Sequence, residues 1–469
     1  MSSILLINTS YPDRKYNSYT RLSVPLGLLS IASPLRNAGF DVDLIDPQID
    51  RYYYESITDQ LKKIPLFVGM TIFMGTNIIN AIELSKYIKK ITDKIPIIWG
   101  GPLATSAPEI CFNNAPIDYI VMGMGEKTIV EVAFKLKKNK DPKFVSHVSY
   151  LEGNIVKKKS IYMFSDDIDR LHYPQLDMWQ KGIDIINSIP ILSSRGCPRN
   201  CAFCYNNTFS GRKKWYGRTA QNVLDEMGYW ANFYKKNSFY FIDDNFLVNT
   251  KRAREILLKS KERNYLIDQV IGHVYDFKPE ILQVITEYIH HVGFSIESAS
   301  KKIQKLLNKS IDLDKVLFLI KYLSENQIKV ITTNFMFGLP TETDEDIQIN
   351  IEMALQIRKI NKEVRIIPYI YTPQPQDDII PQFDFFNNVH FTIEALSTID
   401  LAPNRCNILS HEIRPWMDET EILFYLDLVH VWFFHFDHVV RESQMVDIEK
   451  IFMKNNRLYK LFKNVPMPV

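Results

Sequence analysis

Hydrophobic residues in the first third of the chain fall into short apolar runs separated by longer amphipathic stretches. The runs predict buried strands at residues 4–7, 40–45, 66–72, 95–99 and 119–122. The stretches between them predict helices, with the clearest at residues 25–35, 77–90 and 128–138. Strands that alternate with helices in this way indicate a doubly wound, Rossmann-like parallel sheet. In such a sheet, ligands lie beyond the carboxyl ends of the strands.

A second alternation of strands and helices begins at Ile189. Apolar runs predict strands at residues 189–192, 238–242, 269–273, 293–298, 329–336 and 364–371, with helices between them. Six such units suit a partial (β/α)6 barrel, whose functional residues are expected where the strands end. Beyond about residue 385 the pattern is mostly helical and rich in aromatic residues, which are more often core than cofactor contacts.

The expected fold is therefore α/β with a helical C-terminal cap over the barrel. We expect a Rossmann-like domain at residues 1–140, a linker at 141–188, the partial barrel at 189–384 and the helical domain at 385–469.

The composition excludes few classes of function, but it makes some partners and compartments less expected than others. The 56 basic and 54 acidic residues leave a net charge of +2, which gives no reason to expect nucleic acid or an anionic membrane as partner. No window approaches the ~18 consecutive apolar residues of a membrane span. Three of the five cysteines are clustered, which favours a metal site in a reducing compartment over a disulfide framework, so we expect a cytoplasmic protein.

The clustered cysteines lie in the stretch Cys197-Pro-Arg-Asn-Cys201-Ala-Phe-Cys204, directly after the predicted strand 189–192. Soft thiolate ligands select zinc, copper(I) or iron–sulfur clusters. A closed structural zinc site needs four protein ligands, and no fourth Cys or His lies nearby in the sequence. Three thiolates from one loop suit a cubane cluster with one iron left open. Structural cysteines or part of a zinc knuckle remain the alternative.

The spacing Cys-x3-Cys-x2-Cys, with Phe203 before the last cysteine and Tyr205 after it, resembles the radical SAM superfamily. In that family three cysteines bind a four-iron four-sulfur cluster, and S-adenosylmethionine (SAM) chelates the open iron. The resemblance implies that Cys197, Cys201 and Cys204 bind the cluster. It also implies an external one-electron reductant of the flavodoxin or ferredoxin type and reductive cleavage of SAM to a 5′-deoxyadenosyl radical.

Strand-end residues of the predicted barrel extend the resemblance to SAM binding. The pair Glu297-Ser298 and the stretch Gly338-Leu-Pro340 resemble the fourth- and fifth-strand motifs of the family, and the acids after residue 242 lie on the same rim. The residues that the resemblance assigns to SAM are Phe203, Tyr205, Asp243, Asp244, Glu297, Ser298, Lys309, Asn334 and Gly338. The sixth-strand Pro-x-Pro-Gly-Thr motif is altered here, because Gln376 and Asp377 replace its last two residues.

Small and Gly-rich loops after the N-terminal strands resemble the cobalamin-binding domain that is fused to many radical SAM enzymes. The residues that the resemblance assigns to cobalamin are Ser10, Gly27, Leu28, Thr71, Gly100, Gly101, Pro102, Thr105, Gly123, Gly125 and Glu126. The chain lacks an Asp-x-His-x-x-Gly motif, so it offers no histidine as lower cobalt ligand, and Leu103 stands where many relatives have histidine. A sheet that keeps the fold without the cofactor is the alternative.

Together these resemblances identify the chain as a cobalamin-dependent (class B) radical SAM enzyme, expected to be a methyltransferase acting on an unactivated carbon. A small-molecule or carrier-bound metabolite is the expected substrate. A cyclase or rearrangement enzyme with the same cofactors is the first alternative, and a non-catalytic iron–sulfur or cobalamin sensor is the second. Cys406, outside the cluster motif, is expected to be an ordinary buried cysteine rather than a radical partner.

Overall fold

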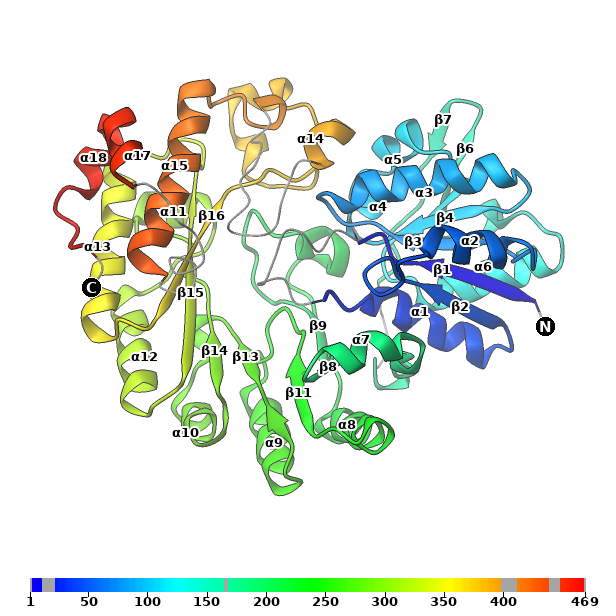
Figure 1. The fold of residues 1–469 in the computed structure, drawn as a ribbon, viewed down its shortest axis with the longest axis horizontal. Coiled ribbons are helices and arrows are strands. Elements are labelled where there is room, and N and C mark those ends of the chain that lie inside the picture. Colours follow the sequence, from blue (N-terminus) through cyan, green and yellow to red (C-terminus); the bar gives the residue numbers. More distant parts are fainter. Residues whose placement is uncertain (1, 11–21, 164–167, 398–410, 438–447, 468–469) are drawn as a thin grey trace. The chain divides into compact units, whose positions relative to one another are not determined.

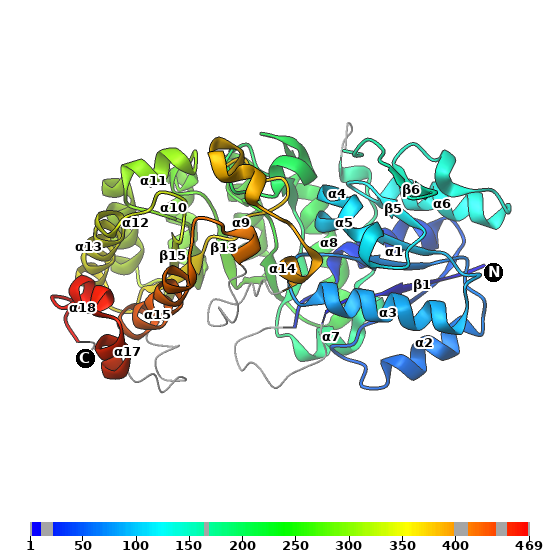
Figure 2. The same cartoon turned by 90° about the horizontal axis from the view of Figure 1, so that it is seen from above.

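The computed structural model describes residues 2–10, 22–163, 168–397, 411–437 and 448–467. Its chain divides into two compact units (Figures 1 and 2). Unit 1 comprises Met1–Asn187, Tyr205–Gly211 and Phe391–Asp400, and unit 2 comprises Ser188–Cys204, Arg212–His390 and Leu401–Val469. Cys406 lies outside the described residues.

Unit 1 is built on a seven-stranded sheet in the order β2-β1-β3-β4-β5-β6-β7. Its strands are β1 (Ser3–Ile7), β2 (Asp41–Ile45), β3 (Val68–Thr71), β4 (Ile97–Gly100), β5 (Tyr119–Val121), β6 (Val148–Glu152) and β7 (Ile155–Lys157). The five predicted strands, β1 to β5, are all present and pair in parallel. The doubly wound α/β prediction is confirmed.

The segment 141–188, expected to be a linker, contributes the last two strands of this sheet. Strand β6 pairs antiparallel with β5, and β7 pairs antiparallel with β6. Gly153 and Asn154 form the connection between the paired residues Glu152 and Ile155, and Gly153 has a φ of +61°. A two-residue Gly-Asn loop is a hairpin signal, so the expectation of a linker without strands was wrong here.

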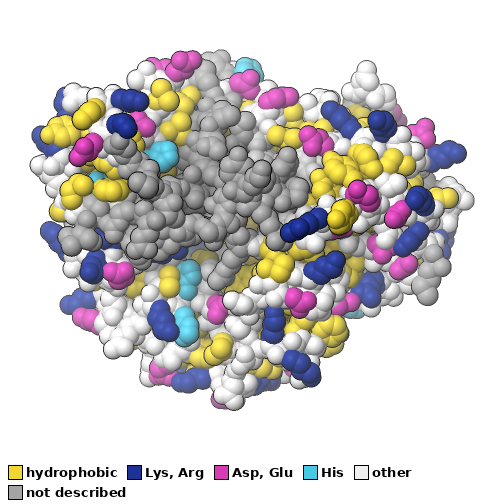
Figure 3. Space-filling view, viewed as in Figure 1, with side chains coloured by type: hydrophobic (Ala, Val, Ile, Leu, Met, Phe, Trp, Pro, Cys, Tyr) yellow, Lys and Arg dark blue, Asp and Glu magenta, His cyan; other side chains and the backbone are white. Residues whose placement is uncertain are grey.

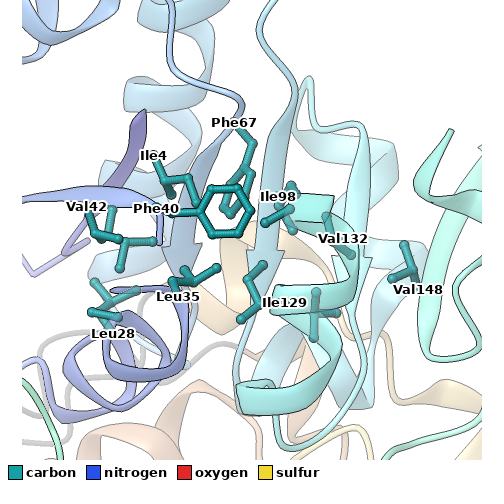
Figure 4. Packing of buried hydrophobic residues seen from close by; sticks show 14 of the residues in the cluster. Ile4, Leu28, Leu35, Phe40, Val42, Phe67, Ile98, Ile129, Val132 and Val148 are labelled. Atoms are coloured by element: carbon teal, nitrogen blue, oxygen red, sulfur yellow. The ribbon is translucent and has the colours of Figure 1, made fainter. Parts of the chain in front are cut away.

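Helices cover both faces of the sheet of unit 1. Helices α1 (Leu26–Asn37) and α6 (Glu126–Lys137) pack on one face, where their apolar residues join Ile4, Phe67 and Ile98 in one core (Figure 4). On the other face lies α3 (Asn77–Ile91), with α2 (Tyr53–Leu61) beside it (Figures 1 and 2). Two short helices, α4 (Pro102–Ser106) and α5 (Pro108–Asn114), follow β4.

The order of the parallel strands defines where a ligand of unit 1 is expected. Strand β1 pairs with β2 on one side and with β3 on the other, so the chain reverses direction across the sheet between β1 and β3. The crevice outside the carboxyl ends at such a switch point is the usual binding site of an open α/β sheet.

Unit 2 holds two parallel sheets, one in the order β12-β11-β8 and the other in the order β13-β14-β15-β16. The strands are β8 (Ile189–Ile191), β11 (Ser238–Phe241), β12 (Leu266–Ile267), β13 (Gln269–Ile271), β14 (His291–Gly293), β15 (Val330–Phe337) and β16 (Arg365–Ile370). Between them run α8 (Ala220–Tyr234), α9 (Thr250–Glu262), α10 (Pro279–Tyr288), α11 (Lys301–Leu306), α12 (Leu313–Glu325) and α13 (Asp344–Ile360). Five of the predicted barrel strands lie where they were expected, whereas β14 shares only Gly293 with the predicted strand at residues 293–298. A short antiparallel ribbon of β9 (Ser194–Gly196) and β10 (Trp215–Gly217) accompanies them.

The C-terminal stretch does not form one separate helical domain. Helix α14 (Ile393–Ser397) belongs to unit 1, where the Gly75 N–H donates to the Leu396 carbonyl at 3.0 Å. Helix α15 (Glu419–Phe436) packs on unit 2, because Trp432 contacts the rings of Phe335 and Phe337. Helices α17 (Ile448–Lys454) and α18 (Asn456–Phe462) follow. The aromatic residues of α15 are therefore core, as expected, but the boundary at residue 385 was wrong. Within the described residues, no helix is long and apolar enough to cross a membrane.

Candidate active site

The three clustered cysteines lie in a loop of unit 2 that backbone hydrogen bonds hold in place. Cys197, Cys201 and Cys204 are thiols rather than disulfides, and each is partly exposed. The Ala202 N–H donates to the Leu307 carbonyl at 2.9 Å, and the Ala202 carbonyl accepts from the Asp378 N–H at 2.9 Å. Two distant segments thus fix the middle of the loop that carries the three cysteines.

The acids Asp243 and Asp244, which follow β11, bind the start of the cysteine loop. The two Asp243 carboxylate oxygens accept from the Ser193 N–H at 2.8 Å, the Ser193 hydroxyl at 2.6 Å and the Ser194 hydroxyl at 2.5 Å. Asp244 accepts from the Gly196 N–H at 2.9 Å. Burial raises the pKa of Asp243 above its ordinary value, against the opposing effect of Arg252 and these hydrogen bonds. The structure therefore gives both acids a part in positioning the loop.

Two of the predicted SAM residues, Lys309 and Asn334, contact the carboxylate of a third, Glu297. Glu297 Oε1 lies 2.9 Å from Lys309 Nζ, and Glu297 Oε2 accepts from Asn334 Nδ2 at 2.7 Å. The side chains of Glu297 and Lys309 are each only 6% exposed. Backbone hydrogen bonds fix Glu297, since its N–H donates to the Asn334 carbonyl at 3.1 Å and its carbonyl accepts from Met336 N–H at 2.7 Å. Glu297 adopts a φ of +65°, an uncommon conformation for a residue other than Gly, Asn or Asp.

This carboxylate–ammonium pair acts electrostatically on the cysteine loop. Burial raises the pKa of the Cys201 thiol, Lys309 opposes that rise, and Glu297 adds to it. Burial also lowers the pKa of His273 to about 3, and the positive charges of Lys309 and Arg199 contribute to this shift. His273 thus belongs to the same neighbourhood in a neutral form.

Other predicted SAM residues take part in the packing of the protein itself. The fully buried Ser298 donates through Oγ to Asn350 Oδ1 at 3.2 Å and accepts from the Ser300 N–H. Gly338 has a φ of +75° and donates its N–H to Glu342 Oε2 at 2.7 Å. Phe203 packs against a core cluster that includes Ala202 and Leu307. Tyr205 opens the segment Tyr205–Gly211, which groups with unit 1.

Two residues that the sequence reasoning missed lie beside the cysteines. Arg199, inside the cysteine motif itself, donates through Nη2 to Asp276 Oδ1 at 2.7 Å. Asn245, directly after the predicted acids, donates to Asp276 Oδ2 at 2.7 Å. Arg199 lies inside the cysteine motif and Asn245 follows the two predicted acids, so the sequence offered a signal for both residues. Nothing in the sequence near Asp276 indicated its role.

The donor set fits an iron–sulfur cluster. Among the described residues, no three His, Cys, Asp or Glu side chains converge on a single metal ion. In a four-iron cluster each thiolate binds a different iron, so the three sulfur atoms need not converge on one point. Cationic Lys309 and Arg199 act on the Cys201 thiol and favour its thiolate form, which is the form that binds metal.

Several predicted cobalamin residues, among them Ser10, Thr71 and Gly100, lie on the carboxyl-end rim of the sheet of unit 1, where neighbouring loops hydrogen-bond to one another. Thr9 Oγ1 donates to the Thr71 carbonyl at 2.8 Å, across the switch point between β1 and β3. Asn80 Nδ2 donates to the carbonyls of Thr9 and Ser10 at 3.1 and 3.2 Å. Thr105 Oγ1 accepts from the Gly123 N–H at 3.0 Å, so this hydroxyl joins the segments that follow β4 and β5.

Two of the rim glycines are required by the chain itself. Gly101 has a φ of +95°, and a Cβ atom there would lie 3.0 Å from the Ile72 carbonyl oxygen. Gly123 has a φ of +81°, and its Cβ would lie 2.3 Å from the Tyr162 carbonyl oxygen. At Gly27 and Gly100 an added Cβ would meet only ordinary contacts at 3.6 Å, so the chain itself does not require a glycine there. A switch-point rim with such small residues fits a large flat ligand such as a corrin.

Leu28 does not fit the role that was expected for it. Its side chain is 1% exposed and packs in the core between α1 and the sheet. Gly27, its neighbour on α1, faces Thr71 instead. Because successive helical residues point in directions about 100° apart, only one of this pair can face the rim.

Comparisons with known proteins agree with both parts of this description. The family model for the radical SAM superfamily matches residues 191–354, and the model for the B12 binding domain matches residues 18–133. The "Uncharacterized methyltransferase PH0819" of Pyrococcus horikoshii is 28% identical over 411 residues, which cover 86% of this chain and 88% of the relative. The "Cytidylyl-2-hydroxyethylphosphonate methyltransferase" of Streptomyces wedmorensis is 23% identical and covers 75% of this chain and 76% of the relative.

Among solved structures, the radical SAM methyltransferase TsrM from Kitasatospora setae, with cobalamin and a [4Fe-4S] cluster bound, superposes with a TM-score of 0.69. The match covers 90% of this chain and 86% of that chain, at 16% sequence identity, and supports the fold. The two matched domains imply a four-iron four-sulfur cluster, SAM and cobalamin as cofactors, which confirms the prediction. The chain therefore carries a radical SAM domain and a B12 binding domain, the two domains that cobalamin-dependent radical SAM enzymes combine.

Proposed function

We propose that this enzyme transfers a methyl group to an unactivated carbon of a small-molecule or carrier-bound metabolite. The observation that carries the proposal is the correspondence, over 86% and 75% of this chain, with two relatives that are named methyltransferases. When bound, SAM at the reduced cluster supplies a 5′-deoxyadenosyl radical, and cobalamin supplies the methyl group. The residues of the chain then bind and orient these groups.

In this proposal Cys197, Cys201 and Cys204 hold the cluster. The backbone bonds at Ala202 set the shape of the loop, and Asp243 and Asp244 fix its first turn. These two acids act as positioning residues in the proposal, because the oxygens described above are already engaged by the loop.

The buried pair of Glu297 and Lys309 suits the amino-acid end of SAM, which carries one positive and one negative charge. Glu297 can accept a hydrogen bond from the ammonium group, and Lys309 can donate to the carboxylate. Asn334 holds the second oxygen of Glu297 at 2.7 Å and thereby orients the carboxylate. A charged ligand that pairs with both side chains offsets part of the cost of burying them.

In unit 1, we propose that cobalamin lies on the rim formed by Ser10, Gly27, Thr71 and Gly100, with the loops around Gly101 and Gly123 behind it. The hydrogen bond from Thr9 to Thr71 keeps the two loops of the switch point together. Small residues on this rim let the backbone approach a flat ring system closely.

The partners in this proposal are the substrate and an external one-electron reductant, and the compartment is the reducing cytoplasm. On the face drawn in Figure 3, basic and acidic side chains are interspersed, as a net charge of +2 leads one to expect. That distribution supports a metabolite over a nucleic acid as the substrate.

The test uses reconstituted enzyme, a strong reductant, SAM labelled in its methyl group and an extract of small metabolites. Mass spectrometry should find a labelled product together with 5′-deoxyadenosine. Formation of 5′-deoxyadenosine with an unlabelled product would replace methyl transfer by cyclisation or rearrangement. If no 5′-deoxyadenosine forms, the sensor alternative is favoured. A variant with all three loop cysteines changed to alanine should form neither product.

A further inference from the structure

Arg199 occupies the middle of the cysteine motif, two residues from Cys197 and two from Cys201. Its backbone N–H and the side chain of Asn245 lie beside the Cys197 sulfur. Its guanidinium group donates through Nη2 to Asp276 Oδ1 at 2.7 Å. Arg199 therefore places a permanent positive charge, and one N–H donor, beside the sulfur atoms of this loop.

Two other segments hold the guanidinium group in that place. Asp276 ends the turn that follows β13, and its second oxygen accepts from Asn245 Nδ2 at 2.7 Å. The Asp276 side chain is 13% exposed and that of Arg199 is 34% exposed. The pair is thus anchored on both oxygens of Asp276, and because that carboxylate is mostly buried, solvent screens the pair less than it screens a fully exposed pair.

Part of the hydrogen-bonding capacity of Arg199 is not used by Asp276. Its Nε atom is buried and makes no hydrogen bond within the described part of the chain. The positive charge also acts on the second cysteine of the loop, Cys201. Arg199 and Asp276 thus place opposite charges near a site whose ligands are soft sulfur atoms.

The reduction potential of an iron–sulfur cluster depends on nearby charge, on hydrogen bonds to its sulfur atoms and on solvent exposure. Reduction adds one electron to the cluster, taken from the external reductant, and neither makes nor breaks a covalent bond. A fixed positive charge stabilises the more negative, reduced cluster, and a fixed negative charge opposes it. The two members of the pair should therefore act with opposite signs.

We propose that Arg199 and Asp276 form a charge pair that sets the reduction potential of the cluster, with Arg199 raising it and Asp276 limiting the rise. This inference rests on the proposed role of the three cysteines as cluster ligands. It adds a positioning and tuning role for three residues, Arg199, Asp276 and Asn245, that no motif assigned.

The alternative is that the ion pair has only a structural role and holds the cysteine loop against the turn after β13. Loss of either partner would then disturb the loop in the same way, and any change in potential would have the same sign in both variants. Opposite shifts from Arg199→Gln and Asp276→Asn separate a tuning role from a structural one.

The test is a redox titration of the reconstituted, SAM-free protein with dithionite, followed by the electron paramagnetic resonance signal of the reduced cluster. We expect R199Q to make one-electron reduction roughly tenfold less favourable, a fall of ~59 mV. D276N should raise the potential, and R199K, which keeps the charge, should stay near the parent value. The control is K259Q, which removes one charge from the exposed pair of Lys259 and Glu255 in the same unit and should shift nothing.

Shifts of the same sign in R199Q and D276N, or shifts no larger than in K259Q, would overturn the proposal. If R199Q fails to retain iron, D276N and R199K still decide, because a potential that does not rise in D276N, or that falls in R199K, contradicts it. A parent protein that holds no four-iron cluster would overturn the proposed function instead. Iron analysis of each sample therefore keeps the two failures distinguishable.

Discussion

The Nζ atom of Lys309 lies 2.9 Å from Oε1 of Glu297, and both side chains are almost entirely removed from solvent. Removing two charges from water costs several kcal/mol per ion, which a single contact between them repays only in part. Asn334 supplies one further hydrogen bond to Glu297. The proposed ligand, the zwitterionic end of SAM, would supply the remaining partners, which explains why a fold keeps such a pair at this place.

Glu297→Gln should weaken SAM binding at least tenfold and lower the stability of unit 2. The change leaves the Lys309 ammonium buried without its counter-ion, and breaking one partner of a buried pair costs about 3–5 kcal/mol. Equilibrium dialysis of labelled SAM and urea-induced unfolding measure the two effects. The matched control is Glu325→Gln, which breaks the exposed pair with Lys321 and should change neither quantity. Unchanged SAM binding in E297Q would remove this residue from the proposed site.

Asp243→Asn should reduce the iron that the protein retains after reconstitution and desalting. Asp243 accepts three hydrogen bonds from Ser193 and Ser194, and an amide replaces one acceptor oxygen by a donor. A buried donor or acceptor left unsatisfied costs about 1–3 kcal/mol, which should loosen the first turn of the cysteine loop.

The control for D243N is Asp225→Asn on the surface of α8, where Asp225 accepts an exposed hydrogen bond from Gln221. D225N should retain iron as the parent protein does. Full iron retention in D243N would mean that the loop keeps its shape without this carboxylate.

Gly123→Ala should destabilise unit 1 far more than Gly153→Ala, although both glycines have a positive φ. At Gly123 the new Cβ would lie 2.3 Å from the Tyr162 carbonyl oxygen, whereas nothing lies within 4 Å of a Cβ at Gly153. The strain of the left-handed conformation alone costs roughly 1–2 kcal/mol and is common to both variants. Thermal unfolding midpoints measure the difference. Equal decreases of the midpoint in the two variants would show that the backbone near Tyr162 moves to make room for the new Cβ at little cost.

Stability should depend on pH through Glu342, whose pKa burial raises to about 8. The folded chain holds the proton more tightly than the unfolded chain, where the ordinary pKa of 4.5 applies. The stability that the buried, protonated Glu342 contributes is therefore fully present below about pH 4.5. This contribution to the free energy of unfolding is lost as the pH rises through 8, by roughly 1.4 kcal/mol per pH unit. Glu342→Gln should gain stability over the parent protein as the pH rises from 5.5 to 8.5. A constant difference between the two thermal unfolding midpoints across that range would contradict the assignment.

Much of the fold could be predicted because burial imposes a period on the sequence. The short apolar runs of β1 and β3 and the alternation along β15 gave strands at the correct places. The approach of Glu297 to Asn334 agrees with the rule that the strand ends of a barrel share one face, whereas Lys309 reaches Glu297 from the segment after α11. The hairpin of β6 and β7 was missed even though Gly153-Asn154 signals such a turn, because the edge strand β7 is only three residues long and shows no clear alternation.

The direction in which individual side chains point could not be predicted from the sequence as well as the strands were. Leu28 and Ser298 stand beside Gly27 and Glu297 in the sequence, yet Leu28 packs in the core of unit 1 and Ser298 hydrogen-bonds to Asn350. The positive φ of Glu297 redirects the chain before Ser298, and no sequence pattern reveals such a local conformation. The contact between Arg199 and Asp276 joins residues far apart in the chain, so only the assembled fold brings them together.

The measurement that tests this account most directly is anaerobic reconstitution with iron, sulfide and hydroxocobalamin, followed by metal analysis and an absorption spectrum of the desalted protein. We predict about four irons and one cobalt per chain, with the iron lost when the three loop cysteines are changed to alanine. Iron without cobalt would contradict the proposed methyl transfer, because the domain of residues 18–133 would then keep its fold without its cofactor.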